Sequence, residues 1–131
     1  MKIAVDTNIL VRAVVRDDKM QAEAAARVLR NASLVAVAAS SLCEFVWVLR
    51  SAYRFQSSDI AKAIRTLLTA ENVEANRPAI DAGLAVLDAG GDFADGVIAY
   101  EGRWLGAETF VSFDKKAVEK LAGQGVAARA L

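Results

Sequence analysis

The segment Lys2-Ile3-Ala4-Val5-Asp6-Thr7-Asn8-Ile9-Leu10 decides the fold class, because it joins a strand pattern to a helix pattern through a carboxylate. Residues 2–5 are a short apolar run, which predicts a β-strand that ends at Asp6. Apolar residues then recur at helical spacing as far as Val14, and we expect Asn8 to cap this helix.

The alternation of short strands and amphipathic helices continues along the chain. Further strands are predicted at residues 34–38, 72–75, 109–112 and 126–130. Helices are predicted at residues 20–29, 78–89, 92–104 and 114–121, with two more that begin at Ser41 and at Ser57 or Ser58. Short, almost entirely apolar strands are typical of a mainly parallel sheet flanked by helices, so the predicted fold class is α/β. A chain of 131 residues has room for one core, which predicts a single domain over residues 1–131.

Composition narrows the possible chemistry. Hydrophobic residues make up 55% of the chain, which excludes a disordered tail, and the single cysteine, Cys43, excludes an internal disulfide and is expected to be buried. The chain has no histidine, so catalysis must use carboxylates, hydroxyls, amines or metal ions. Because 16 basic residues balance 16 acidic ones, no overall positive charge points to nucleic acid.

Targeting signals are not apparent in the sequence. The first apolar run meets a charge at Asp6, and no stretch reaches the roughly 18 apolar residues that a membrane span needs. We therefore expect a cytoplasmic protein that makes no membrane contact.

Four carboxylates fall where the predicted strands end or the following helices begin. They are Asp6, Glu44, Asp95 and Asp114. In a parallel sheet these positions share one edge, which is where ligands bind. Each acid also has a structural interpretation: Ser41 and Glu44 fit a capping box, and the aspartates could cap helices. Four converging carboxylates would repel one another unless a cation neutralised them, and Mg²⁺ and Mn²⁺ prefer such oxygen ligands.

The residues around these acids resemble the four motifs of PIN-domain nucleases. The motifs are Val5-Asp6-Thr7-Asn8-Ile9-Leu10, Ser40/Ser41 with Glu44, Asp95-Gly96-Val97-Ile98-Ala99, and Thr109-Phe110-Val111-Ser112-Phe113-Asp114. They occur in this order over residues 5–114, and the layout is most similar to VapC-type toxins of toxin–antitoxin pairs. One departure is Gly96, where the family more often has a larger residue; we expect it to loosen the helix start without touching a ligand.

The resemblance implies a PIN-like three-layer fold with a five-stranded sheet, a Mg²⁺ or Mn²⁺ cofactor, and endonucleolytic cleavage of RNA. It also implies inhibition by a cognate antitoxin and a homodimer. A housekeeping PIN-domain nuclease for RNA processing is the alternative within the family.

The resemblance also assigns roles to individual residues. Asp6 and Asp95 would be the primary metal ligands, and Glu44 and Asp114 would complete the catalytic site. Residues expected to support these ligands are Thr7, Asn8, Ser41 and Asp92. Basic residues that could contact RNA phosphates are Arg12, Arg16, Lys115 and Lys116. Trp47 and Trp104 are expected in the core or at an interface.

Three other functions use acids at a sheet edge. An aspartyl phosphatase would need a second aspartate two positions after Asp6, where this chain has Asn8. A signalling receiver would need a phosphoacceptor aspartate after residues 34–38, and none is present. In a binding module without activity the acids would only cap helices.

Overall fold

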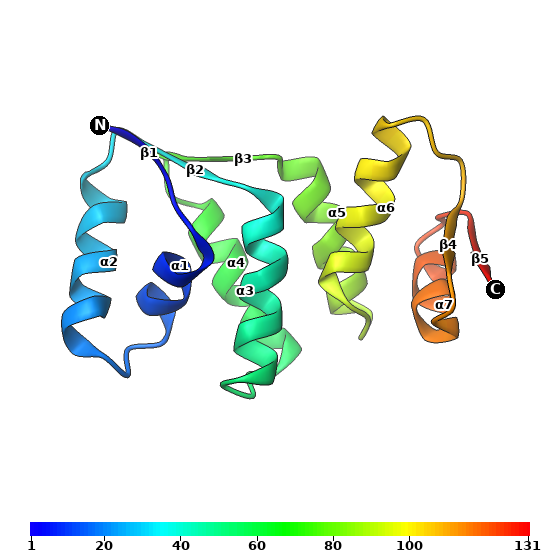
Figure 1. Cartoon of the computed structure of the whole chain (residues 1–131), viewed down its shortest axis with the longest axis horizontal. Helices are drawn as coiled ribbons and strands as arrows, with labels where there is room; N and C mark the ends of the chain where they lie inside the picture. The colour runs from blue at the N-terminus through cyan, green and yellow to red at the C-terminus, as the bar shows by residue number, and fades with distance from the viewer. The chain divides into compact units, whose positions relative to one another are not determined.

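All 131 residues are described by the computed structural model, and they divide into two compact units. The first unit comprises Met1–Ala75 and the second Asn76–Leu131. Figure 1 shows the helices and strands in their order along the chain.

The first unit is a three-stranded parallel sheet with four helices. Its elements are β1 (Lys2–Ala4), α1 (Thr7–Val14), α2 (Lys19–Asn31), β2 (Leu34–Val37), α3 (Ala39–Ser51), α4 (Ser57–Leu68) and β3 (Val73–Ala75). The strand order is β1-β2-β3, so the central strand β2 pairs on both sides (Figure 1). Ala4 lies opposite Ala36, which places the carboxyl ends of β1 and β2 at the same edge.

The core of the first unit consists of the apolar side chains on the buried faces of its helices and of its central strand. Leu42 and Leu49 of α3 and Ile60 and Ile64 of α4 are fully buried, as is Val35 of β2. Their spacing of four or seven residues within each helix is that of one helix face, which explains why these segments fold as helices that pack together.

The second unit contains three helices and a two-stranded parallel sheet. Its elements are α5 (Arg77–Asp88), α6 (Phe93–Trp104), β4 (Phe110–Ser112), α7 (Lys115–Gly123) and β5 (Ala128–Ala130). β4 pairs with β5 in parallel. Val86, Ala99 and Leu121 bring α5, α6 and α7 together, and Phe110, Val126 and Ala128 pack against them.

Two glycines set the close packing of α5 against α6. A Cβ atom added at Gly96 would overlap the carbonyl group of Ala82 and lie 2.8 Å from the Cα atom of Gly83. A Cβ atom at Gly83 would in turn lie 2.7 Å from the Phe93 ring. Gly96 was expected to loosen the start of its helix; the structure shows a packing role as well, because its missing side chain lets the two backbones approach closely.

The predicted α/β class is confirmed, with five strands whose pairings are all parallel. Three of the strands form one sheet in the first unit and two form another in the second unit. None of the seven helices has the length and apolar character needed to span a lipid bilayer.

The caps predicted for three helices are wrong, although α4 begins at Ser57, one of the two predicted positions. α1 is capped by Asp6, whose side chain accepts a hydrogen bond from Ile9 N, and not by Asn8. α3 begins at Ala39, two residues before the predicted Ser41, and α4 follows Gln56 without a side-chain cap from either serine.

The two tryptophans are not part of the core. Trp47 is 69% exposed and Trp104 is 77% exposed, and the indole N–H of Trp104 donates a 2.7 Å hydrogen bond to the hydroxyl of Tyr100. Cys43 is half-buried.

Candidate active site

Asp6 stands at the carboxyl end of β1, where the chain leaves the sheet. Val5 continues the pairing through a 3.4 Å hydrogen bond from its N–H to the carbonyl of Ala36, and Asp6 is the next residue. The Asp6 Oδ1 atom accepts a 3.1 Å hydrogen bond from Ile9 N, while the side chain remains exposed. The predicted position of Asp6 at the end of a strand, directly before a helix, is confirmed.

Thr7, which directly follows Asp6 in the sequence, connects this end of α1 to Glu44 on α3. The Thr7 hydroxyl lies 3.1 Å from Glu44 Oε2 and 3.3 Å from the carbonyl oxygen of Ser41, so its single proton is shared between two acceptors. Thr7 was predicted to support the metal ligands, and in the structure it contacts one of them, Glu44. Glu44 and Asp6, 38 residues apart in sequence, are thereby brought to one edge of the first sheet.

The capping box predicted for Ser41 and Glu44 is absent. Because α3 begins at Ala39, Glu44 falls in its second turn and cannot reach the helix start. Ser41 contributes its backbone carbonyl to the Thr7 contact. Glu44 therefore does not cap α3, and its side chain is exposed to solvent beside Thr7.

The second unit gathers the other predicted acids at the starts of α6 and α7. Asp92 caps α6 by accepting a 3.1 Å hydrogen bond from Ala94 N, and Asp95 follows in the first turn. Asp114 caps α7: its Oδ1 atom accepts hydrogen bonds from Lys116 N at 3.0 Å and Ala117 N at 3.1 Å.

The charges of Asp92 and Asp114 act on Asp95. Burial raises the pKa of the Asp95 carboxyl above its ordinary value, and the negative charges of Asp92 and Asp114 raise it further. The influences on this pKa include no cationic side chain. A divalent cation would offset the repulsion, and carboxylate oxygens are the donors that Mg²⁺ and Mn²⁺ prefer.

The acids therefore form two groups, one in each unit. Asp6 and Glu44 form the first group, and Asp92, Asp95 and Asp114 form the second. No set of three or more Asp, Glu, Cys or His side chains is close enough in the structure to hold a metal ion by itself. The donor set in both groups, carboxylate oxygens without nitrogen or sulfur, fits a hard divalent cation.

The remaining predicted residues lie around these groups. Asn8 is exposed two residues after Asp6, Arg16 is exposed beyond the far end of α1, and Lys115 and Lys116 are exposed directly after Asp114. Arg12 is ion-paired: its Nη1 atom lies 2.7 Å from Asp17 Oδ1. Asp17 was not predicted from the sequence, because its partner Tyr53 lies 36 positions away.

A cavity of about 670 Å³ in the second unit contains none of the predicted acids. It is lined by the second half of α6, by residues 106–111 and by residues 125–127. Cavities are the usual first choice for a ligand site, but none of the acids predicted from the sequence lines this one. The acid groups are therefore the better candidates for the chemistry.

Replacing Asp95 should stabilise the metal-free protein. A raised native pKa means that the ionised carboxylate opposes folding, so stability is lost as the pH rises through that pKa. In chelator at pH 7, Asp95→Asn is expected to raise the melting temperature by roughly 1–3 °C, a small effect because the half-buried group is partly screened by solvent. The gain should disappear toward about pH 3, where both states bind the proton.

Circular dichroism melts across this pH range test that expectation. Asp81→Asn, which changes an exposed acid on α5, is the matched control and should leave the melting temperature unchanged. An Asp95→Asn protein that melts below wild type at pH 7 would show that the carboxylate is already neutralised in the metal-free protein.

The chain combines parallel α/β units with carboxylates at strand and helix ends, and it contains no histidine. The chain belongs to the PIN domain family, whose family model matches residues 3–123. The match runs through both units and includes all the predicted acids. PIN domains are generally nucleases that typically use divalent metals, so the family indicates nuclease activity. No curated protein matches the chain closely enough to count as a relative.

Proposed function

We propose that the protein is a Mg²⁺- or Mn²⁺-dependent endoribonuclease and that residues 1–131 work as one PIN-like nuclease domain. The observation that carries this proposal is the placement of Asp92, Asp95 and Asp114 at the starts of α6 and α7, where burial and the charges of Asp92 and Asp114 raise the pKa of the Asp95 carboxyl. The family match, which continues through both units, supports it.

Four acids would hold the metal in this proposal. Asp6 and Asp95 are the primary ligands, and Glu44 and Asp114 complete the site. A bound divalent ion supplies positive charge to the scissile phosphate and acidity to a water molecule. Asp92, which caps α6 beside Asp95, and Thr7, which contacts Glu44, hold the ligands in place. Asn8 and Ser41 are further candidates for this supporting role.

Binding of RNA would use exposed basic residues of both units. Lys115 and Lys116 follow Asp114 directly, and Arg16 follows α1. Contacts to backbone phosphates supply much of the affinity for nucleic acid and weaken with added salt. Arg12 was predicted to act in the same way, but its guanidinium is ion-paired with Asp17, which favours a structural role.

Removal of divalent metal is expected to abolish RNA cleavage. With purified protein and a labelled single-stranded RNA, chelator should lower the rate by about a thousandfold or more, and excess Mn²⁺ should restore it, because the ion supplies several kcal/mol of charge stabilisation. A phosphomonoester should not be hydrolysed, which separates a nuclease from an aspartyl phosphatase. Cleavage that continues unchanged in chelator would contradict the proposed cofactor.

We further propose that the nuclease is the toxin of a toxin–antitoxin pair, a cytoplasmic homodimer inhibited by a cognate antitoxin. This proposal depends on the resemblance to VapC-type toxins in motif order and length. Expression of the wild-type chain should arrest bacterial growth, and co-expression of the protein from the neighbouring reading frame should relieve the arrest. Normal growth during high-level expression would favour a housekeeping nuclease instead.

A further inference from the structure

We propose that Arg12, Asp17 and Tyr53 form a positioning clamp for the first acid pair: they fix the far end of α1 to the far end of α3, and thereby the placement of Asp6 and Glu44 at the near end. The inference rests on the proposed function, since it concerns the same metal site.

The near end of the helix pair carries the acids. Thr7, the first residue of α1, contacts Glu44 and the carbonyl of Ser41 on α3. Asp6 precedes Thr7 and caps the same helix. Any sliding or rotation of α1 along α3 therefore changes the relation between the Asp6 and Glu44 carboxylates.

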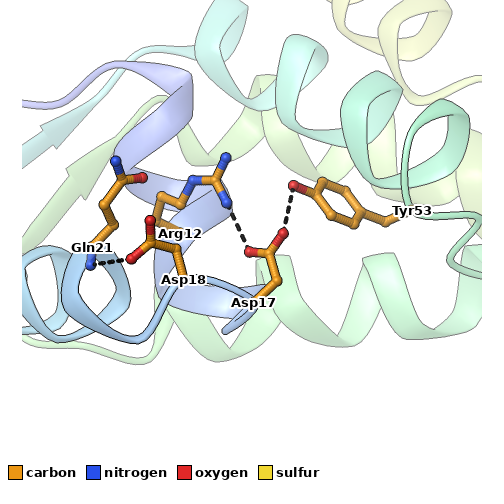
Figure 2. Close-up of polar contacts among 5 residues, drawn as sticks. All are labelled: Arg12, Asp17, Asp18, Gln21 and Tyr53. Atoms are coloured by element: carbon orange, nitrogen blue, oxygen red, sulfur yellow. Dashed lines mark hydrogen bonds and ion pairs between the residues drawn. The ribbon is translucent and has the colours of Figure 1, made fainter.

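The far end is held by three polar groups, shown in Figure 2. Arg12, on the last turn of α1, places Nη1 2.7 Å from Asp17 Oδ1. The other carboxylate oxygen, Asp17 Oδ2, accepts a 3.4 Å hydrogen bond from the hydroxyl of Tyr53, which follows α3. One carboxylate in the loop between α1 and α2 thus connects the ends of two helices.

The Arg12 side chain is turned toward the protein. It is 24% exposed, and its Nε atom is buried without a hydrogen-bond partner. A residue that grips RNA phosphates would present its guanidinium to solvent, as the exposed Arg16 can. The orientation of Arg12 therefore favours the clamp over the RNA contact that the sequence predicted.

A pair of helices held together at both ends is more constrained than a pair held at one end. Buried apolar side chains such as Leu10 and Val11 hold α1 in the core, but apolar packing alone tolerates small shifts. Polar contacts at both ends define the register of α1 against α3. Metal sites need their ligands held to within a fraction of an ångström, so a loosened far end should weaken the metal site at the near end.

The test compares two neighbouring aspartates, both drawn in Figure 2. Asp17→Ala breaks the clamp. Asp18→Ala removes the N-cap of α2, a 3.1 Å hydrogen bond from Gln21 N, without touching α3. Both variants are expected to lose stability, but only Asp17→Ala should weaken Mn²⁺ binding, by roughly tenfold as for other residues that orient metal ligands. The Mn²⁺ dissociation constant of the full chain is measured by electron paramagnetic resonance without RNA.

The cleavage assay supplies a second readout. Asp17→Ala should raise the Mn²⁺ concentration for half-maximal cleavage, with a smaller effect on the maximal rate at saturating Mn²⁺. Arg12→Gln should do the same, and the double variant should be no worse than either single variant, because both residues belong to one network. Should Asp17→Ala fail to fold, Tyr53→Phe, which removes only the hydroxyl, is expected to weaken Mn²⁺ binding about threefold.

The outcomes separate this inference from the proposed function. A wild-type protein that neither binds Mn²⁺ nor cleaves RNA overturns both. A wild type that does both, with Mn²⁺ affinity unchanged in Asp17→Ala or reduced equally in Asp18→Ala, overturns the clamp alone. Loss of RNA affinity in Arg12→Gln but not in Asp17→Ala would show that Arg12 contacts RNA and would also overturn it.

Discussion

Asp6→Asn is expected to lower the rate of metal-dependent RNA cleavage by about a thousandfold or more while leaving the fold intact. Asparagine is as good an N-cap as aspartate, so the hydrogen bond from Ile9 N and the start of α1 should persist. The amide carries no negative charge, however, and is a much poorer ligand for a hard divalent cation. The substitution therefore removes a proposed metal ligand without removing a structural contact.

The matched control is Asp18→Asn. Asp18 caps α2 through a hydrogen bond from the third following N–H, with the same 3.1 Å length as the Asp6 cap, but it lies away from Glu44 and Thr7. Single-turnover cleavage of a labelled RNA at saturating Mn²⁺ compares the two variants. Cleavage near the wild-type rate in Asp6→Asn, or an equal loss in both variants, would remove Asp6 from the proposed catalytic site.

The largest effect on stability is expected for Gly96→Ala. Its new methyl group would meet the backbone of α5 at Ala82 and Gly83, which cannot rotate away as a side chain could. The two helices must separate, and overpacking of this kind lowers the free energy of unfolding by about 1–3 kcal/mol, with the upper end expected against backbone. Urea denaturation followed by far-ultraviolet circular dichroism measures the change.

Gly102→Ala, on the same helix, is the control for this experiment. A Cβ atom at Gly102 would meet only the Ala107 Cβ atom, at 3.8 Å, which is ordinary contact. Alanine also favours the helix over glycine, so Gly102→Ala should raise the free energy of unfolding by about 0.5–1 kcal/mol. If the two variants were equally stable, the close approach of α5 and α6 would not depend on Gly96.

The sequence predicted the features of the fold that depend on local pattern. Short apolar runs gave the strands, and Asp92 and Asp114 were identified as possible helix caps, which they are. For Asp114 the cap does not compete with the proposed metal binding. A cap uses one carboxylate oxygen, and the other remains for a ligand.

The features that the sequence did not predict depend on contacts between distant segments. The start of α3 was placed at Ser41 because serine is a good cap, but the preceding alanines favour helix and extend it. The Asp17–Tyr53 contact joins residues 36 positions apart, and no local pattern marks it. The role of Gly96 likewise depends on its contact with Ala82 and Gly83 of α5, which the sequence around Gly96 does not indicate.

The helix caps have a consequence for how an ion would be received. Asp6 and Asp114 each engage the Oδ1 atom with backbone N–H groups, which restricts the side-chain torsions before any ligand arrives. Little rotamer entropy is then left to lose on coordination, and the uncommitted Oδ2 atom favours monodentate over bidentate ligation. Such an arrangement suits a small octahedral ion that retains several water molecules, as Mg²⁺ does, better than the larger Ca²⁺.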